Sequence, residues 1–315
     1  MASYSTNDAG IGLAGISLCA GYGGLDLGIA IAEPSYRTVC YVEREAHAAA
    51  ALVARMADQA LDQALIWDDL KTFDGRAWRG RIHILTAGYP CQPFSLAGKR
   101  RGEADPRHLW PDVARIIDEA RPTAIFAENV EGHIDLGFAE VVGSLRELGY
   151  HAKAGLFTAR EVGASHRRRR LFILAYADSE RCGLSAGSDG RPGACPAEVA
   201  VRHGSDEFRP VLAEQCGAGM DPAVDRVADD GLATGKLDAG IDVPVFAPGP
   251  GELQIWQRLL DRRPDLQPAL LRTGDGMADR LDRTRGGGNG VCSLAAAFAY
   301  STLKADFERE WRAAA

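Results

Sequence analysis

The sequence predicts an α/β protein built on a doubly wound, mostly parallel sheet, with a second, smaller domain inserted late in the chain. Residues 14–177 alternate short apolar runs with helical patterns, and this alternation stops after residue 178. Such alternation is typical of a parallel sheet with helices on its faces. A chain of 315 residues is long enough for one large domain of this class and a smaller one.

The individual elements follow from the period of the apolar residues. Short apolar runs favour strands, and apolar residues spaced three and four apart favour helices. The expected strands are Gly15–Ala20, Thr38–Glu43, Ala64–Ile66, Ile82–Thr86, Thr123–Glu128, His151–Phe157 and Leu171–Ala175, and the expected helices are Gly24–Ala32, Arg44–Ala57, Leu109–Ala120 and Glu140–Leu148.

The chain changes character after the last of these strands. From Asp178 to about Pro250 it is rich in Gly, Ala, Asp and Pro with little periodicity, which predicts loops on a weak scaffold or partial disorder. A short helix is expected at Glu252–Asp261 and an amphipathic helix at Val291–Trp311. Because a terminal helix with an apolar face usually packs on an existing core, we expect a first domain over 1–177, an inserted domain over 178–285 and a returning segment over 286–315.

Composition excludes several classes of protein. The seven cysteines are scattered and form no CxxC pair, which argues against a disulfide framework and a zinc site. We find no secretory signal and no apolar run of transmembrane length, so a reducing cytoplasm is expected. The net charge of −7 counts against a surface that coats nucleic acid throughout, but arginine is clustered, which leaves room for a local basic cleft.

The most informative motif is Pro90-Cys91-Gln92-Pro93, directly after the buried-strand candidate Ile82–Thr86. Prolines fix φ and restrain the preceding residue, so the thiol of Cys91 has a largely preset position at a strand's carboxyl end. Open α/β sheets bind ligands there, and preset geometry suits a nucleophile. A lone cysteine is otherwise most often a small buried hydrophobe.

Acidic residues and a glycine-rich turn follow other strands in the same way. Gly21-Tyr22-Gly23-Gly24 follows the first strand and opens a helix, so its backbone can approach a ligand closely. Glu43 ends the second strand, where an acid can bind ribose hydroxyls. Asp69 follows the third strand and could accept from an adenine amino group, although such an acid is usually a helix cap.

Two further motifs carry charge. Glu128-Asn129-Val130 ends a strand in the same crevice as Cys91, which makes Glu128 a candidate acid or hydrogen-bond donor. His166-Arg167-Arg168-Arg169-Arg170 precedes another strand, and in an extended segment His166, Arg168 and Arg170 would share one face. These basic groups could contact phosphate or lower the pKa of a thiol, although a charge run is usually a solvated face.

Taken in order, these motifs and Gly288-Asn289-Gly290 resemble the C5-cytosine DNA methyltransferase family over residues 14–176 and 274–299. The resemblance implies a Rossmann-like methyltransferase fold that uses S-adenosyl-L-methionine and an inserted target-recognition domain. It implies that the Cys91 thiolate attacks C6 of a flipped-out cytosine while Glu128 contacts N3 and the exocyclic amine. Arg168 would support the base and the thiolate, and Arg170 would fix the local loop.

The resemblance also assigns binding residues. The cofactor would be bound by Cys19, Gly21, Tyr22, Gly23, Gly24, Leu25, Glu43, Arg44, Asp69, Leu70, Pro90, Asn289 and Gly290. DNA would be contacted by Gln92, Ser95, His166 and the mobile-loop residues Lys99, Arg100 and Arg101. Bases would be read by side chains of the insertion, for which the candidates are Arg191, Arg202, Arg209, Gln254, Arg258, Arg262 and Arg263.

Three features depart from the family pattern. Cys19 stands where an aromatic side chain usually stacks on adenine, and His166 stands where glutamine is common. The last motif reads Asn289-Gly290-Val291-Cys292-Ser293 instead of Asn-x-Val-Val-Pro. None of these removes a core catalytic residue, so we expect an active enzyme.

The resemblance implies double-stranded DNA as the partner, no membrane, and a monomer. It leaves open a cognate restriction endonuclease that acts on the same site without forming a stable complex. Three other functions were weighed: the same chemistry on RNA, a DNA-binding regulator that flips no base, and a methyltransferase for small molecules. The long insertion argues against RNA, and the presence of Cys91 and Glu128 argues against a regulator. The Pro-Cys loop and the basic run argue against a small-molecule substrate.

Overall fold

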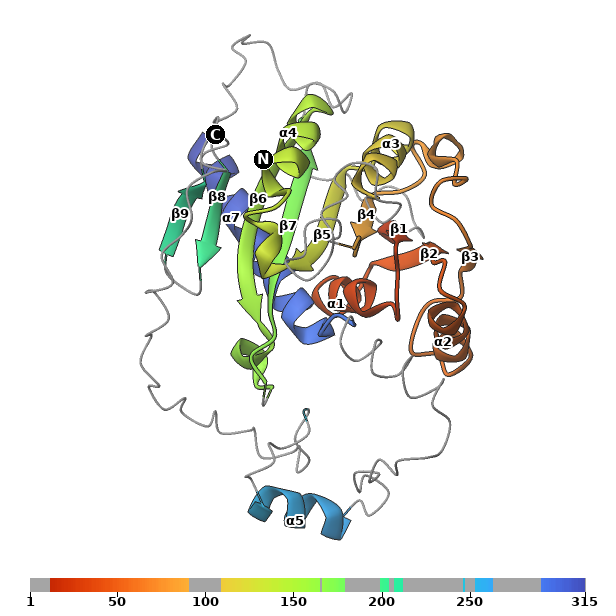
Figure 1. Ribbon diagram of the computed structural model, residues 1–315, viewed down its shortest axis with the longest axis vertical. Helices are drawn as coiled ribbons and strands as arrows, with labels where there is room; N and C mark the ends of the chain where they lie inside the picture. The colour runs from red at the N-terminus through yellow and green to blue at the C-terminus, as the bar shows by residue number, and fades with distance from the viewer. Residues whose placement is uncertain are drawn as a thin grey trace.

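The fold is seen in a computed structural model that describes residues 12–90, 109–164, 166–178, 199–203, 207–211, 246, 253–262 and 290–314. Within these residues the strands form one sheet in the order β3-β2-β1-β4-β5-β7-β6-β8-β9, with helices on both faces (Figure 1). The strands are β1 Ala14–Leu18, β2 Arg37–Val42, β3 Leu65–Trp67, β4 Ile84–Ala87, β5 Ala124–Val130, β6 Tyr150–Thr158, β7 Arg169–Ala177, β8 Val199–His203 and β9 Glu207–Val211.

The strands from β3 to β5 run parallel and bring their carboxyl ends to one edge of the sheet. In register, Leu18 of β1 pairs with Val42 of β2 and with Ala87 of β4. The strand order reverses between β1 and β4, and open α/β sheets bind ligands in the crevice at such a reversal. The fold therefore places the ends of β1, β2, β4 and β5 around one candidate site.

Helices cover both faces, as expected for a doubly wound sheet. The α-helices are α1 Gly24–Ala32, α2 Ala46–Ala57, α3 Trp110–Ala120, α4 Phe138–Glu147, α5 Leu253–Arg262 and α7 Ser293–Ala314, and short 3₁₀ turns lie at η1 Gly75–Trp78, η3 Glu131–His133 and η4 Ala159–Val162.

Among the described residues, the two larger apolar cores lie on opposite faces of the sheet, and a third, smaller cluster joins Tyr41 of β2 to Leu52 and Met56 of α2. Leu85 and Ile125 belong to the core beneath α3 and α4, while the neighbouring strand residues Ile84 and Phe126 belong to the core beneath α1 and α7. This split follows from the alternation of side chains along a strand. Because both faces are buried, the central strands are continuous apolar runs, which is why the sequence predicts them well.

The C-terminal helix packs against the helix that follows the glycine turn. A Cβ on Gly28 of α1 would lie 2.5 Å from the Cβ of Ala296 in α7 and 2.8 Å from the carbonyl oxygen of Ser293. The absence of a side chain at Gly28 therefore lets the two helices approach closely. Helix α7 therefore packs against α1 and the apolar core on that face of the sheet.

The predicted class, an α/β fold with a mostly parallel sheet, is confirmed, with three differences in detail. β7 begins at Arg169, so two arginines of the basic run belong to the strand. β7 pairs antiparallel with both β5 and β6. The insertion contributes β8 and β9, which pair with each other and extend the sheet beyond β6, where the sequence had predicted loops or disorder. The domain boundaries at 177 and 285 stay a prediction.

In the part of the chain that the structure describes, no helix is both long enough and apolar enough to cross a membrane.

Candidate functional site

The glycine turn between β1 and α1 has the backbone that the motif predicts. Gly21 and Gly23 have φ values of +55° and +71°, a region that glycine adopts without strain. A Cβ on Gly21 would meet no atom within 4 Å, whereas one on Gly23 would lie 2.7 Å from the side chain of Leu61. The turn is thus packed against Leu61 at Gly23 and open at Gly21, and α1 begins directly after it.

Glu43 links this turn to the end of β2. Its Oε2 accepts a hydrogen bond of 2.7 Å from the Gly21 amide, and its Oε1 accepts one of 2.8 Å from the Glu45 amide. Each carboxylate oxygen has a second lone pair, so Glu43 can still accept from a ligand hydroxyl. The structure therefore brings together Glu43 and the glycine turn, which are 22 positions apart in the sequence.

The remaining residues of the turn lie nearby with different degrees of burial. Burial and the carboxylates of Glu43 and Asp112 raise the pKa of the Cys19 thiol to about 12, so this cysteine stays neutral. Tyr22 is half-buried, and its carbonyl accepts from Arg55. Leu25 is buried in the core between α1 and α7, so a contact with a cofactor would come from its backbone.

A second acidic position lies at the end of β3. Asp69 is half-buried, and its Oδ1 accepts a 2.9 Å hydrogen bond from the Lys71 amide. Leu70 is buried in the core beneath α3 and α4. The backbone of Glu43 donates a 2.9 Å hydrogen bond to the carbonyl of Trp67, which ties the ends of β2 and β3 together. Arg44, the residue after Glu43, is exposed.

The loop after β4 is anchored immediately before the cysteine. Tyr89 is buried, its hydroxyl lies 3.0 Å from Nε2 of His133, and its ring centroid lies 5.0 Å from that of Trp110. Its carbonyl accepts a 3.2 Å hydrogen bond from the side chain of Asn129. Pro90 follows and is exposed. The other predicted site residues of this loop lie outside the described residues: Cys91, Gln92, Ser95, Lys99, Arg100 and Arg101.

Glu128 is a buried carboxyl group at the carboxyl end of β5. Its side chain is 7% exposed, and its Oε1 lies 3.0 Å from Nε of Arg170 on β7. Burial raises the pKa of Glu128 to about 7, against the opposing effect of the Arg170 and Arg168 charges, which lower it. A carboxyl group tuned to neutral pH can donate or accept a proton, which is a property of catalytic acids.

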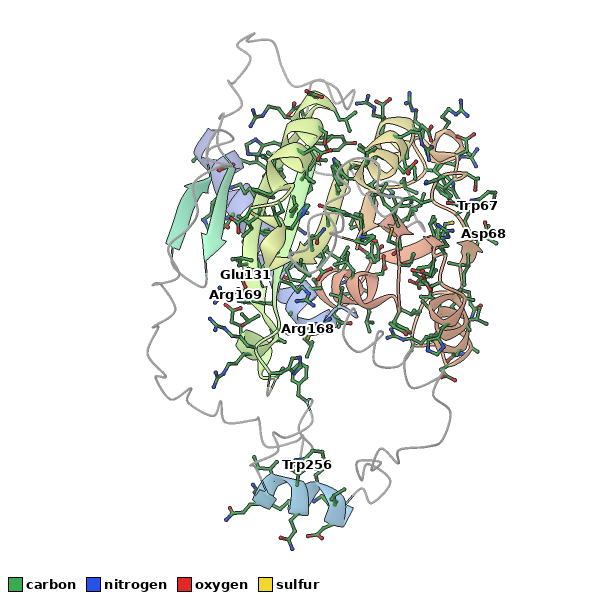
Figure 2. The ribbon with its side chains drawn as sticks, in the orientation of Figure 1. Trp67, Asp68, Glu131, Arg168, Arg169 and Trp256 are labelled. Carbon is green, nitrogen blue, oxygen red and sulfur yellow. The ribbon has the colours of Figure 1, made fainter. Side chains whose placement is uncertain are left out.

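The arginines of the basic run have different partners, and the run is not extended throughout, because β7 begins only at Arg169. Arg168 has a φ of +35° and its guanidinium donates to the carbonyl of Gly290, just before α7. Burial and the nearby Arg170 lower the pKa of Arg168. Arg169 instead forms an ion pair of 2.5 Å with Glu131, and Figure 2 places these two side chains next to each other. His166 is exposed, and Asn289 lies outside the described residues.

Sequence reasoning missed a buried acid on α1. The Asp26 carboxylate accepts hydrogen bonds from Ser17 at 2.6 Å, Thr86 at 2.8 Å and Tyr36 at 3.1 Å. Burial raises the pKa of Asp26, and the three hydroxyl donors oppose this rise. The signal in the sequence is a single acid on the buried side of an otherwise apolar helix.

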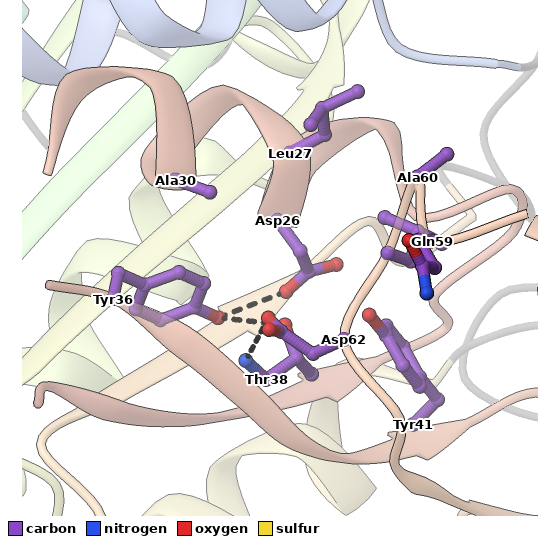
Figure 3. Close-up of a pocket in the computed structure, with 10 residues that line it drawn as sticks. Asp26, Leu27, Ala30, Tyr36, Thr38, Tyr41, Gln59, Ala60 and Asp62 are labelled. Atoms are coloured by element: carbon purple, nitrogen blue, oxygen red, sulfur yellow. Dashed lines mark hydrogen bonds between the residues drawn. The ribbon is translucent and has the colours of Figure 1, made fainter. Parts of the chain in front are cut away.

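Asp26 lines a pocket of about 170 Å³ between α1, β2 and the loop before β3 (Figure 3). The hydroxyl of Tyr36 joins Asp26 to Thr38, whose amide donates a 2.9 Å hydrogen bond to Asp62. Tyr41 also lines the pocket, and its buried hydroxyl has no hydrogen-bond partner among the described residues. These contacts tie α1 to β2 beneath the glycine turn.

The arrangement defines a class of protein: an α/β fold with a glycine-rich turn at the point where the strand order reverses and a buried acid at the carboxyl end of β5. Residues 13–191, more than half of the chain, match the family described as C-5 cytosine-specific DNA methylase. The chain belongs to this family.

Individual relatives agree with the family. The chain is 35% identical over 164 residues to the Type II methyltransferase M.NgoMIV of Neisseria gonorrhoeae, which covers 51% of this chain and 50% of that protein. It is 34% identical over 165 residues to the Type II methyltransferase M.PspPI of Psychrobacter sp. (strain TA137). That match covers 50% of this chain and 38% of that protein. The chain thus spans half or less of the length of these curated relatives.

A crystal structure of the Dnmt2 methyltransferase of S. pombe matches with a TM-score of 0.45 and 21% identity, over 56% of this chain and 53% of that one.

Methyltransferases of this family use S-adenosyl-L-methionine, and the residues present fit it. The turn offers open space at Gly21 and leads directly into α1, which begins at Gly24. The fixed carboxylate of Glu43 can accept from ribose hydroxyls, and Asp69 lies one strand further along the same edge. These residues suit a ligand that carries hydroxyl groups and a purine.

Proposed function

We propose that this chain is a DNA (cytosine-5-)-methyltransferase, which transfers a methyl group to C5 of a flipped-out cytosine within a short duplex sequence. The observation that carries the proposal is the buried carboxyl group of Glu128, whose pKa is raised to about 7 at the same sheet edge as the loop that leads to Cys91. A target base has to leave the helical stack, because its reacting atoms cannot be reached inside a duplex.

Glu128 would hold the target base in a form that accepts a nucleophile. With a pKa of about 7, a substantial fraction of Glu128 is protonated at neutral pH. The protonated carboxyl can donate to N3 of cytosine while its carbonyl oxygen accepts from the exocyclic amine. A hydrogen bond to N3 withdraws electron density from the ring and favours attack at C6.

Cys91 would be the nucleophile. Its thiolate forms a bond to C6, and the electron pair of the C5–C6 double bond moves toward C5 and the ring. When bound, S-adenosyl-L-methionine supplies the methyl group that C5 then takes. Loss of the C5 proton to a base restores the double bond, and the C6–sulfur bond breaks to release the thiolate. Tyr89 lies two residues before Cys91 in the sequence, and contacts with His133 and Asn129 hold its hydroxyl and its carbonyl in place. This anchoring supports a preset position for the nucleophile.

The arginines would stabilise charge around this reaction. Arg170 pairs with Glu128, and Arg168 lies near both, so two positive charges surround the place where the base is bound. Such charges favour a thiolate over a thiol and stabilise negative charge on the attacked ring. The contact between Arg168 and the Gly290 carbonyl also supports the segment that precedes α7.

The proposal includes the partners and the location. Double-stranded DNA is the substrate, the insertion reads the recognition sequence, and the protein acts as a cytoplasmic monomer. A cognate restriction endonuclease acting on the same sequence is consistent with the relatives named as Type II methyltransferases. No stable complex with such an enzyme is needed for this function.

The test is transfer of a labelled methyl group from S-adenosyl-L-methionine to plasmid DNA, to tRNA, and to a reaction without nucleic acid. Incorporation into DNA alone, lost in Cys91→Ser, is expected. Incorporation into tRNA alone would instead establish the RNA enzyme. Binding of DNA without incorporation would favour a regulator, and label in a small molecule without nucleic acid would favour a small-molecule enzyme.

A further inference from the structure

An exposed tryptophan lies at the carboxyl end of β3, beside the residues proposed to bind the cofactor. Trp67 is the last residue of β3, and its carbonyl accepts the 2.9 Å hydrogen bond from the Glu43 amide. Asp69 follows two residues later. Figure 2 shows Trp67 at this outer end of the sheet, next to Asp68. The backbone of Trp67 therefore lies next to two positions of the proposed cofactor site, Glu43 and Asp69.

The indole ring is held at one side and is open to solvent elsewhere. Its Nε1 donates a 3.0 Å hydrogen bond to the hydroxyl of Thr72, and its centroid lies 6.2 Å from that of Phe73 in an edge-to-face contact. Phe73 is buried and stacks on Trp78 at 6.3 Å. Trp67 nevertheless remains 45% exposed. A fixed aromatic ring with an exposed surface is suited to stack on another flat ring, because little side-chain entropy is lost when it binds.

Trp67 lies on the same face of the sheet as Cys19. It pairs in register with Val42, and the side chains of paired residues project from the same face. Val42 and Phe73 belong to the core beneath α3 and α4, and Cys19 packs against that same core. β1 and β3 are separated by β2, so their ends lie roughly 10 Å apart at the usual strand spacing. A stacked ring pair needs about 4.5–7 Å between centroids, so a flat ring fits between the two positions.

The small, neutral side chain at Cys19 leaves the β1 side without an aromatic surface. The thiol has its pKa raised to about 12, so it offers no charge for a base to interact with. From these contacts we infer that Trp67 is the residue on which the purine ring of S-adenosyl-L-methionine stacks. The inference rests on the proposed function, and it assigns adenine recognition to the end of β3 in place of the turn after β1.

Another exposed apolar residue of the same strand provides a matched control. Leu65 is 71% exposed and lies two residues before Trp67, on the same face but at the amino end of β3. If Trp67 were exposed only because β3 is an edge strand, replacing either residue would have the same effect on ligand binding. If Trp67 stacks on the purine, only its replacement weakens binding.

The experiment is titration calorimetry with S-adenosylhomocysteine on the full chain and on Trp67→Ala, Trp67→Phe and Leu65→Ala. Loss of a base–aromatic stack is expected to raise the Kd about tenfold or more in Trp67→Ala. Trp67→Phe should retain binding within about threefold, since phenylalanine keeps an aromatic face. Leu65→Ala should bind as the wild type does.

A spectroscopic measurement keeps the test independent of folding in the alanine variant. Stacking of the purine should quench tryptophan fluorescence in the wild type, and this ligand-dependent change should disappear in Trp67→Phe while persisting in Trp311→Phe, a change on the distant helix α7. If the wild type binds S-adenosylhomocysteine but Trp67→Ala has the same Kd, the Trp67 inference is wrong. If the wild type does not bind it at all, the proposed function itself fails.

Discussion

Arg170 Nε lies 3.0 Å from Glu128 Oε1 across the antiparallel pair of β5 and β7. Glu128 faces the same core as Phe126 and Phe172, so its carboxylate is largely removed from water. The arginine charge lowers the pKa of Glu128, burial raises it, and burial is the larger effect, which leaves the pKa at about 7. This pair therefore places a carboxyl group that titrates near neutral pH at the carboxyl end of β5, the strand that pairs with β4.

The first prediction concerns the pH dependence of this carboxyl group. Because the folded-state pKa is raised above the ordinary value of 4.5, the folded protein holds the Glu128 proton over a window in which the unfolded chain has lost it. Stability contributed by Glu128 is thus present below pH 4.5 and falls as the pH rises to about 7. Glu128→Gln does not titrate. Urea unfolding should show the wild type losing up to about 3 kcal/mol relative to this variant between pH 4.5 and 8. A constant difference would contradict the assigned pKa.

The same titration should appear in catalysis. If protonated Glu128 donates to the base, the single-turnover methylation rate should fall as the pH rises above about 7. Glu128→Gln keeps an N–H donor that does not ionise, so its lower rate should lack this descending limb. Rates measured from pH 6 to 9 in both proteins provide the check. A descending limb that persists in the glutamine variant would assign it to another group.

Glu43 should support cofactor binding through the glycine turn. Glu43→Ala removes the acceptor for the Gly21 amide and the carboxylate proposed to bind the ribose, so affinity for S-adenosyl-L-methionine should fall about tenfold or more. Glu43→Gln keeps an acceptor oxygen and should lose less. The exposed neighbour Glu45 provides the control, since Glu45→Ala removes a charge without removing this contact. Equal affinities for the wild type and Glu43→Ala would reduce Glu43 to a structural residue.

Two glycines in helices should respond in opposite ways to alanine. A Cβ on Gly28 would overlap Ala296 and Ser293, so Gly28→Ala should push α7 away and cost about 1–3 kcal/mol. A Cβ on Gly143 of α4 would meet nothing within 4 Å, so Gly143→Ala should stabilise by about 0.5–1 kcal/mol. Thermal unfolding of the two variants compares these effects directly. A stable Gly28→Ala variant would show that α7 can shift at little cost.

The two tyrosines beside Asp26 also form a matched pair. The Tyr36 hydroxyl donates to a buried carboxylate, so Tyr36→Phe should cost about 1.5–3 kcal/mol. The Tyr41 hydroxyl is buried without a partner among the described residues, so Tyr41→Phe should stay within about 1 kcal/mol of the wild type or be slightly more stable. Denaturant unfolding at pH 7 distinguishes the two. Equal losses would mean that the hydroxyls make equivalent contacts.

The parallel half of the fold was predictable because its strands are buried on both faces. Runs such as Ile82–Thr86 are therefore continuously apolar, and their order along the chain implies the helices between them. The start of β7 was not predictable in the same way, because Arg169 and Arg170 interact with acids on neighbouring elements. The pairing of β8 with β6 joins residues 47 positions apart, such as Ala154 and Val201, and no local pattern encodes such a contact.

The candidate site was also predictable only where a local sequence pattern marks the residue. Glu43 and Glu128 could be predicted as site residues because each ends an apolar strand, and the ends of parallel strands meet. The network around Asp26 could not be predicted, since its three donors come from β1, β4 and the residue before β2, and only the folded chain brings them together. The roles assigned to Cys91 and Asn289 lie outside the described residues and stay predictions.

The most direct test of the central claim is bisulfite sequencing of plasmid DNA from cells that express this chain, compared with cells that express Cys91→Ser. The account predicts protected cytosines at one recurring short sequence with the wild type and none with the variant. Protection that persists in Cys91→Ser would contradict the assigned nucleophile. Its absence from both would contradict DNA methylation by this chain.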